Sequence, residues 1–419
     1  MTSQTFVWQY DIASWRVALV CTLAVLTCGL WESRHRCPCR AACGAYGWRR
    51  TNLCWEHRRF ELITPSHGKS DILAPRPSAH PLTTTVIGSW PKPSWLSSGA
   101  HDISGWAVDR EWRFHGEELR RKQDEATEWA LRQQEKTGVD IVSDGEIRRD
   151  NYVHYYCQHL DGFDFERRAR ITGRSGAWSW AAPMITGPIA SRQSCLAADY
   201  QFIRDRTERC VKMTIPGPMT IIDSVADEYY RDDVALAMDL AATIRMEVEA
   251  LAAAGCHVVQ FDEPVFARFP NKVSDYGLRA LEACFEGVTG ITTVVHVCRG
   301  YPIEGYDKAN ADSYTHLAPM LANSKIDQIS IEGAHGPLDL GVLRRFGDKG
   351  LIFGVVDAGD SRIETVEEIE ARIKQVLGHV RPDRLSVGPD CGMVFLDPEV
   401  AKAKLTNLVE GARRVREGL

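Results

Sequence analysis

The stretch His257–Pro264 (HVVQFDEP) decides the fold of this chain. Its first residues are apolar and partly β-branched, as in a buried strand, and it ends in two acids and a proline. A helical stretch rich in Ala, Leu, Met and Glu precedes it at Asp232–Ala254, and Gly255 follows as the residue that ends the helix. A buried strand beside an amphipathic helix is the repeating unit of a parallel α/β fold.

Seven further runs of the same kind extend this pattern along the chain. The eight runs are Thr83–Ser89, Asp140–Glu146, Cys210–Pro218, His257–Pro264, Thr292–Cys298, Asp327–Glu332, Leu351–Ala358 and Arg384–Gly392. Helical patterns lie between them; one of the clearest, Thr365–Leu377, has acids in its first turns and basic residues later, as the helix dipole favours. Eight strand–helix units in about 340 residues predict a single (β/α)8 TIM barrel over residues 81–419.

Most of the eight runs end on polar side chains. In barrels of this kind the active site lies at the carboxyl ends of the strands. One polar strand end is as often a cap as a functional group, but a whole set at one end of a barrel predicts a site. The set consists of Ser89, Glu146, Asp262, His296, Cys298, Glu332 and Cys391.

Three of these strands end in side chains that bind zinc. His296 and Cys298 are two residues apart on one strand, so both side chains lie on the same face. Cys391 ends the eighth strand and Glu332 the sixth, and together the four predict a tetrahedral site with two thiolates. A carboxylate that a substrate can displace indicates a catalytic zinc. His335, three residues after Glu332, is the competing ligand.

The composition divides the chain near residue 80. Residues 1–80 hold six of the 13 Cys, five of the 12 Trp, and ten Lys+Arg against five Asp+Glu; the remainder has 40 against 51. We predict a poorly structured Cys/Trp/Arg-rich extension over residues 1–80, outside the catalytic fold. Its apolar run Val17–Trp31 is short for a membrane span, so a membrane protein is not expected.

Net charge and the remaining cysteines limit the function and the compartment. A net charge of −6 argues against a nucleic-acid partner. The core cysteines show no paired spacing, which predicts reduced thiols and a cytoplasmic protein; they are Cys157, Cys195, Cys210, Cys256 and Cys284.

Six motifs occur in the same order as in cobalamin-independent methionine synthase. They are Ile87-Gly88-Ser89, Gly145-Glu146, Gln260–Pro264 (QFDEP), His296-Val297-Cys298, Ile329–Glu332 (ISIE) and Pro389–Gly392 (PDCG). Over roughly residues 82–415, the chain resembles the catalytic C-terminal barrel of that family. The resemblance is strongest to its short, core-type members, because the chain has no room for the second barrel of the full-length enzyme.

The resemblance implies transfer of a methyl group to the sulfur of homocysteine, which gives methionine. It implies zinc as the cofactor, with His296, Cys298, Glu332 and Cys391 as ligands. It also implies contacts to the amino acid from Ile87, Gly88 and Ser89, and to its ammonium group from Glu146 and Asp262. A free thiol is mostly protonated at neutral pH, and coordination to zinc yields the thiolate that attacks the methyl group.

The chain departs from the family in the half of the site that binds folate. Gly359 occupies the place of a histidine thought to protonate the folate, and Asp223-Ser224-Val225 replaces a segment whose tryptophan packs on the pterin. Ser179-Trp180 aligns with an Arg–Cys pair that contacts folate. We therefore predict that the stacking surface and the acid are both missing. The methyl donor, a corrinoid or a folate, stays open.

Three other functions remain open at this stage. A related zinc enzyme alkylates coenzyme M with an epoxide, but its sulfonate should favour cations where this chain has Glu146 and Asp262. A decarboxylase of the uroporphyrinogen type would need no thiolate-bound zinc. A catalytically inactive zinc-binding barrel is the third possibility, although the ligand set is intact.

Overall fold

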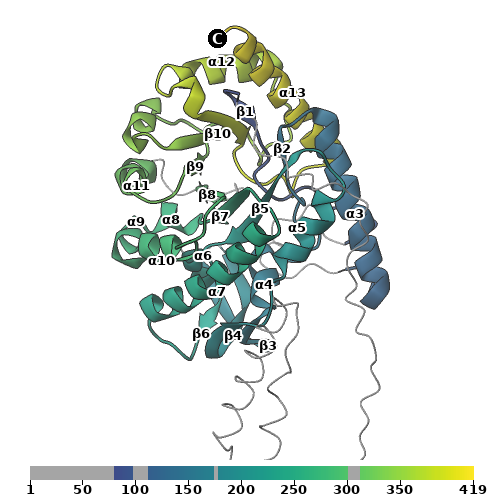
Figure 1. Cartoon of the computed structure of the whole chain (residues 1–419), viewed down its shortest axis with the longest axis vertical. Helices are drawn as coiled ribbons and strands as arrows, with labels where there is room; N and C mark the ends of the chain where they lie inside the picture. Colours follow the sequence, from purple (N-terminus) through teal and green to yellow (C-terminus); the bar gives the residue numbers. More distant parts are fainter. Residues whose placement is uncertain (1–79, 98–111, 174–177, 301–311) are drawn as a thin grey trace, which may run out of the picture. The chain divides into compact units, whose positions relative to one another are not determined.

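The computed structural model describes residues 80–97, 112–173, 178–300 and 312–419 (Figure 1). The predicted extension over residues 1–80, including Val17–Trp31, therefore lies outside the described residues except for His80. In the part that is described, no helix is long and apolar enough to cross a membrane.

Eight parallel strands form the barrel, and each lies within one of the eight runs predicted from the sequence or, for β10, begins one residue before it. The strands are β1 (Thr83–Thr84), β2 (Ile141–Val142), β5 (Cys210–Pro216), β7 (Val258–Asp262), β8 (Thr292–Val297), β9 (Gln328–Ile331), β10 (Gly350–Val356) and β11 (Leu385–Pro389). Their order is β1-β11-β10-β9-β8-β7-β5-β2. A parallel bridge between Thr85 and Ile141 joins the two ends of this order, so the predicted (β/α)8 fold is confirmed.

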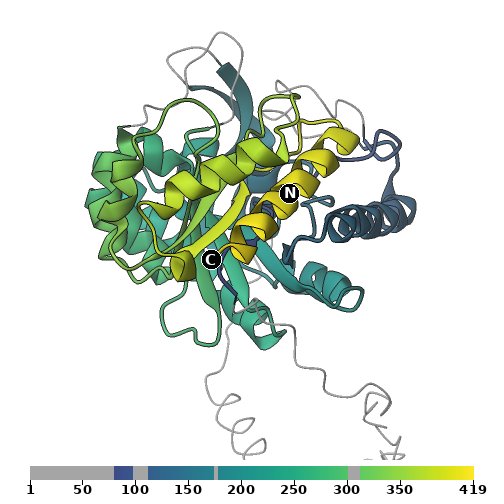
Figure 2. The same cartoon turned by 90° about the horizontal axis from the view of Figure 1, so that it is seen from above.

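Helices surround the strands, and α12 and α13 lie side by side on the outside of the barrel (Figure 2). The helices are α3 (Gly116–Thr137), α4 (Tyr152–Cys157), α5 (Leu196–Arg204), α6 (Pro218–Ser224), α7 (Asp233–Ala253), α8 (Val265–Arg268), α9 (Pro270–Lys272), α10 (Leu278–Ala283), α11 (Ser313–Ala322), α12 (Val366–Leu377) and α13 (Pro398–Glu417). A π-helical turn, Val273–Gly277, and two 3-10 turns, Leu340–Phe346 and Pro382–Arg384, complete the helical segments.

The two helices that the sequence marks most clearly begin and end where the capping residues predict. Asp232 accepts hydrogen bonds from two backbone N–H groups at the start of α7. Gly255, just after the end of α7, has a φ of 90°, which glycine adopts without strain. Thr365 and Glu368 form a capping box at the start of α12.

A three-stranded sheet outside the barrel has no counterpart in the sequence prediction. The long strands β3 (Leu160–Gly173) and β4 (Trp178–Ser191) pair antiparallel, and β6 (Ala226–Asp227) joins the edge of β4. In Figure 1 this sheet lies at the opposite end of the molecule from α12. This second sheet is separate from the eight strand–helix units of the barrel.

The barrel interior changes from apolar to polar along the strands. A small cluster of buried residues fills one level, and it consists of Ile87, Ile141, Cys210, Val258, Val294 and Ile352. Because side chains alternate along a strand, Gln260 and Asp262 share the inward face of Val258, and His296 shares that of Val294. The strands thus carry their polar side chains inward at their carboxyl ends.

Candidate metal centre and substrate pocket

The three predicted ligands His296, Cys298 and Cys391 come together at the carboxyl ends of β8 and β11. Their ligand atoms all lie within 4.8 Å of one another, and all three side chains are buried. The spacing of two on β8 directs His296 and Cys298 inward, and β11 brings Cys391 to them from 93 residues further along the chain. One imidazole and two thiols of this kind form three corners of a zinc site.

The orientation of the His296 ring leaves one nitrogen for a further partner. Its Nδ1 lies 2.9 Å from the hydroxyl oxygen of Ser330, whereas Nε2 is buried with no hydrogen-bond partner among the described residues. A hydrogen bond with the thiol of Cys391, together with the charge of His296, holds the pKa of the Cys298 thiol well below its ordinary range. An orphaned ring nitrogen facing a readily ionised thiol fits a soft divalent metal.

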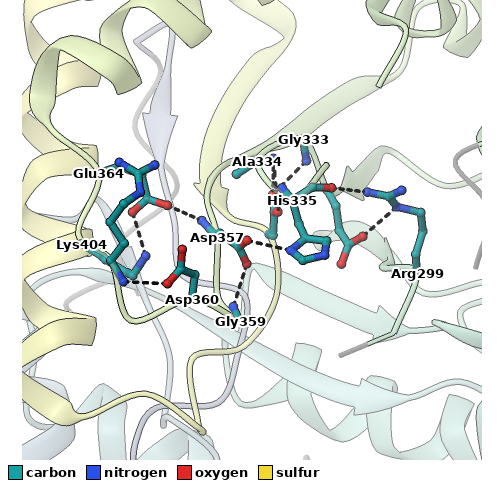
Figure 3. A network of polar contacts seen from close by, with 12 residues as sticks. Arg299, Gly333, Ala334, His335, Asp357, Gly359, Asp360, Glu364 and Lys404 are labelled. Carbon is teal, nitrogen blue, oxygen red and sulfur yellow. Dashed lines mark hydrogen bonds and ion pairs between the residues drawn. The ribbon is translucent and has the colours of Figure 1, made fainter. Parts of the chain in front are cut away.

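The fourth predicted ligand, Glu332, lies outside this group of three. It is fully buried, and its Oε2 accepts a hydrogen bond of 2.9 Å from Nε of Arg299, the residue after Cys298. Arg299 also donates to the backbone oxygen of His335 at 2.6 Å (Figure 3). The competing ligand His335 is likewise outside the group, because its Nδ1 lies 2.7 Å from Asp357.

A buried aspartate joins the segment after Glu332 to the segment after β11 that carries Cys391. Asp390, next to Cys391, accepts hydrogen bonds from the backbone N–H groups of Gly333, Ala334 and His335 at 2.6–3.2 Å. A Cβ at Gly354 would lie 2.0 Å from Asp390 Oδ1, so glycine is required there. The ends of β9 and β11 are therefore held together by one side chain.

Two carboxylates face the same pocket, one from the segment after β2 and one from β7, the strand beside β8. Glu146 follows β2 with a φ of 54°, an unusual backbone conformation for a residue other than glycine. Asp262 ends β7, and burial raises the pKa of its carboxyl group above the usual range. A Cβ at Gly88 would lie 2.7 Å from Glu146 Oε1, so the glycine of the Ile87-Gly88-Ser89 motif makes room for this carboxylate.

One pocket contains eight of the nine site residues predicted from the sequence. Its empty space is about 1340 Å³, counting the open mouth. The eight are Ile87, Gly88, Ser89, Glu146, Asp262, His296, Cys298 and Cys391. Glu332 is the ninth and does not line the pocket. The grouping supports a shared site for these residues, whereas their individual roles stay predictions.

Aromatic side chains also line the pocket. Trp180 of β4 lines it, half-buried, and its indole N–H donates to the backbone oxygen of Ser224 at 3.2 Å. Tyr152 of α4 and an ion pair between Arg268 and Asp223 lie along the same lining. The predicted loss of the stacking surface at Asp223-Ser224-Val225 stays a prediction, and Trp180 of the antiparallel sheet adds an aromatic side chain to the lining.

Gly359, at the place of the expected proton donor, is exposed and does not line the pocket. Its backbone N–H donates to Asp357 Oδ1 at 2.8 Å (Figure 3). His335 forms a hydrogen bond with the other carboxylate oxygen of Asp357. Neither His335 nor Asp357 is among the described residues that line the pocket. The position of the expected proton donor is therefore outside the pocket, and the imidazoles that line the pocket in the described part of the chain are those of His296 and His154.

Several buried residues beside the site were missed by the sequence analysis. Arg149 is 2 % exposed and donates to Thr214 at 3.0 Å, and Thr214 donates to Glu146 at 2.7 Å. Lys212 lies inside the barrel on β5. Lys212 could have been found from the sequence, because it stands within an apolar predicted strand and a buried lysine almost always has a polar partner. No local pattern marked Arg149 or Arg299.

The His-Cys-Cys group and the two carboxylates lie at the carboxyl ends of the barrel strands, where enzymes with an α/β barrel have their active sites. The fold and the site are therefore those of a barrel enzyme. Residues 82–414 match the family model of the cobalamin-independent synthase catalytic domain. The chain belongs to the cobalamin-independent methionine synthase family and is a methyltransferase.

Relatives of similar length support this assignment. The methionine synthase of Saccharolobus solfataricus is 32% identical over 344 residues, which cover 81% of this chain and 96% of that protein. The methionine synthase of Sulfurisphaera tokodaii is 33% identical over 342 residues, 81% of this chain and 94% of that protein. A solved structure of a B12-independent methionine synthase from Shewanella sp. W3-18-1, in complex with selenomethionine, is 34% identical with a TM-score of 0.75, covering 81% of this chain and 98% of that one.

Proposed function

We propose that this chain transfers a methyl group to the sulfur of homocysteine with the help of a bound zinc ion, and so forms methionine. The observation that carries the proposal is the placement of the His-Cys-Cys group and two carboxylates in one pocket. The His-Cys-Cys group can hold a metal ion that binds the substrate's sulfur atom, and the two carboxylates can hold an ammonium group. Homocysteine carries a thiol and an ammonium group on one short chain.

The metal half of the site would use residues that the fold already brings together. His296 Nε2 and the sulfur atoms of Cys298 and Cys391 would hold zinc, with Glu332 as the fourth ligand once it leaves Arg299. Zinc, when bound, favours the thiolate form of a substrate thiol, which is the nucleophilic form. Through its contact with Nδ1, Ser330 would hold the His296 ring with Nε2 free to bind the metal.

The amino-acid half rests on charge. Glu146 and Asp262 both face the pocket, and a substrate ammonium between them would make charge-assisted hydrogen bonds. The Shewanella relative was solved with selenomethionine, an analogue of methionine, which supports an amino-acid site in this family. A sulfonate such as that of coenzyme M would be repelled by the same two carboxylates, so that alternative is disfavoured.

We further propose a methyl donor that needs no protonation by the enzyme, such as methylcobalamin. A folate amine leaves only when it is protonated, so a folate enzyme needs a positioned acid. Gly359 offers no side chain, and it lies outside the pocket. Trp180 can pack on a planar group of either donor, so it does not distinguish between them.

A donor screen tests the proposal. Purified full-length protein with zinc and L-homocysteine would be incubated with methylcobalamin, with methyl-folate and with small S-methyl donors, and methionine would be measured. We expect methylcobalamin to be used orders of magnitude faster than methyl-folate. Turnover of methyl-folate at about one per second, an ordinary enzymatic rate, would contradict the donor proposal. Absence of methionine with every donor would contradict the proposed function itself.

A further inference from the structure

Lys212 is a lysine inside the barrel. It is 0 % exposed and shares the inward face of β5 with Cys210, a member of the apolar level of the interior. Burial lowers the pKa of its amine to about 7. A buried amine is unfavourable unless its N–H groups have acceptors, so the contacts of Lys212 call for a physical account.

Two acceptors surround the amine of Lys212. Its Nζ donates to the backbone oxygen of Val86 and, at 2.7 Å, to Oε1 of Gln260. A neutral amine has two N–H groups and an ammonium has three, so both contacts persist whichever protonation state is present. One of the acceptors belongs to the chain just before the Ile87-Gly88-Ser89 motif, and the other to a side chain of β7.

Lys212 decides which end of the Gln260 amide faces the site. Lys212 donates to the oxygen end of the amide, as an ammonium must, and the NH2 end therefore points the other way. That NH2 group donates to the backbone oxygen of Ile87 at 2.9 Å and to Oδ1 of Asp262 at 2.8 Å. If the amide turned around, its oxygen would face the Asp262 carboxylate and repel it.

We propose that Lys212 is a positioning residue for recognition of the substrate's ammonium group, and that it acts through Gln260. The inference rests on the proposed function, in which Asp262 and the segment Ile87–Ser89 hold the amino acid. The amine of Lys212 contacts Val86, which precedes the segment Ile87–Ser89, and Gln260, which bonds to Asp262, so it orients both substrate-binding groups. The amide between Lys212 and Asp262 also keeps the amine from pairing directly with the carboxylate, so the negative charge stays available to the substrate.

The second carboxylate has the same arrangement. Arg149 Nη1 donates to Thr214 at 3.0 Å, and the Thr214 hydroxyl donates to Glu146 Oε1 at 2.7 Å. Each carboxylate is therefore linked to a buried basic side chain through a neutral side chain. Arg149 also lies 3.5 Å from Glu146 itself, so the separation is complete only on the Lys212 side. For this reason the test uses Lys212.

The test compares two ligands that differ only in the amine. Calorimetry on the zinc-loaded full chain would give the dissociation constants of L-homocysteine and of 4-sulfanylbutanoic acid, which has the thiol and the carboxylate but no amine. We expect Lys212→Met and Gln260→Leu to weaken homocysteine binding roughly tenfold, as for loss of an oriented charged hydrogen bond, and to leave the second ligand within about twofold. Zinc content is measured first to show that the metal half is intact.

Lys404→Met is the matched control. Lys404 is also 0 % exposed and is paired with Glu364 at 2.8 Å, but neither residue lines the pocket (Figure 3). Loss of a buried lysine there should leave both dissociation constants unchanged.

The outcomes separate this inference from the proposed function. If wild type prefers homocysteine but Lys212→Met and Gln260→Leu weaken both ligands equally, or neither, Lys212 has only a structural role and the inference is wrong. If Lys212→Met fails to fold, Gln260→Leu alone decides, because it removes the hydrogen bond to Asp262 that Lys212 is proposed to orient. If wild type does not distinguish the two ligands, recognition of the amine is wrong, and the inference fails with it.

Discussion

Arg299 Nε lies 2.9 Å from Glu332 Oε2, and both side chains are buried. A buried carboxylate needs a cationic partner, and at this place two are available. One is Arg299, which follows the predicted ligand Cys298. The other is the metal ion that the His-Cys-Cys group would hold. If Glu332 is the fourth ligand, as we propose, Arg299 and the metal would compete for the same carboxylate.

The competition predicts that Arg299→Met strengthens the effect of zinc on stability. Without Arg299, Glu332 lacks this cation in the metal-free protein, and a bound zinc ion would supply a positive charge in its place. Zinc should therefore raise the Tm of the variant more than that of wild type, because a ligand stabilises in proportion to its affinity for the folded state. Thermal unfolding with and without zinc measures this, and Arg299→Lys, which keeps a cation, is the control. A smaller gain in the Met variant would show that Arg299 supports the metal site instead.

The two cysteines of the site are predicted to hold the metal. Cys298→Ser and Cys391→Ser should each lose most of the zinc, because a serine hydroxyl is a much poorer ligand than a thiolate. Metal analysis of the purified proteins measures the loss. Cys284→Ser is the matched control, since Cys284 is fully buried and bonded to Ala280 O, outside the pocket. Full zinc retention in either site variant would refute the ligand assignment.

Lys212 should make stability depend on pH. Burial lowers the pKa of its amine from 10.5 to about 7. Between these values the unfolded chain binds a proton that the folded chain does not, so this residue makes the free energy of unfolding rise with pH. The difference in that free energy, wild type minus Lys212→Met, should grow from about pH 7 to about pH 9. Urea unfolding at several pH values measures it, and a difference that stays flat would contradict the buried, deprotonated amine.

Trp180 is predicted to contact the methyl donor and not the amino acid. Trp180→Ala should raise the KM for the donor roughly threefold to tenfold, the size expected for loss of one aromatic packing contact. The dissociation constant of homocysteine should not change. Trp95→Ala serves as control, because Trp95 is 41% exposed and does not line the pocket. Equal effects of the two substitutions on donor KM would remove Trp180 from the donor site.

Residues 1–80 are predicted to add nothing to catalysis. All eight barrel strands and all nine predicted site residues lie beyond them. A chain that starts at Pro81 should fold, bind zinc and methylate homocysteine at the rate of the full chain. Circular dichroism, metal analysis and the methionine assay together check this. A loss of folding would show that the barrel depends on the extension.

The barrel could be predicted from the sequence because its signals are local and repeated. Each strand is a short apolar run, and the polar residues that follow are read directly from the chain. The antiparallel sheet was missed for physical reasons. Strands β3 and β4 mix exposed, half-buried and buried residues, contain Gly162, Pro183 and Pro188, and pair with each other rather than repeat the strand–helix unit.

The metal and amine residues were predicted, but their partners were not. A spacing of two on β8 is visible in the sequence, and the family motifs supplied Glu146 and Asp262. The contacts Arg299–Glu332 and Arg149–Thr214 join residues 33 and 65 positions apart. Such pairs depend on which strands become neighbours in the closed barrel, and composition and periodicity do not contain that information.

The sheet that carries Trp180 shares no strand with the barrel. Its strands can change in length or sequence without breaking a hydrogen bond of the eight-stranded ring. The thiol end of the pocket and its outer wall can consequently evolve at different rates, and an engineer could exchange residues 160–191 for the matching segment of a relative. Such chimeras would keep the site for the methyl-accepting thiol and vary the part of the pocket proposed to contact the methyl donor. The β3–β4 hairpin could then be exchanged as one segment.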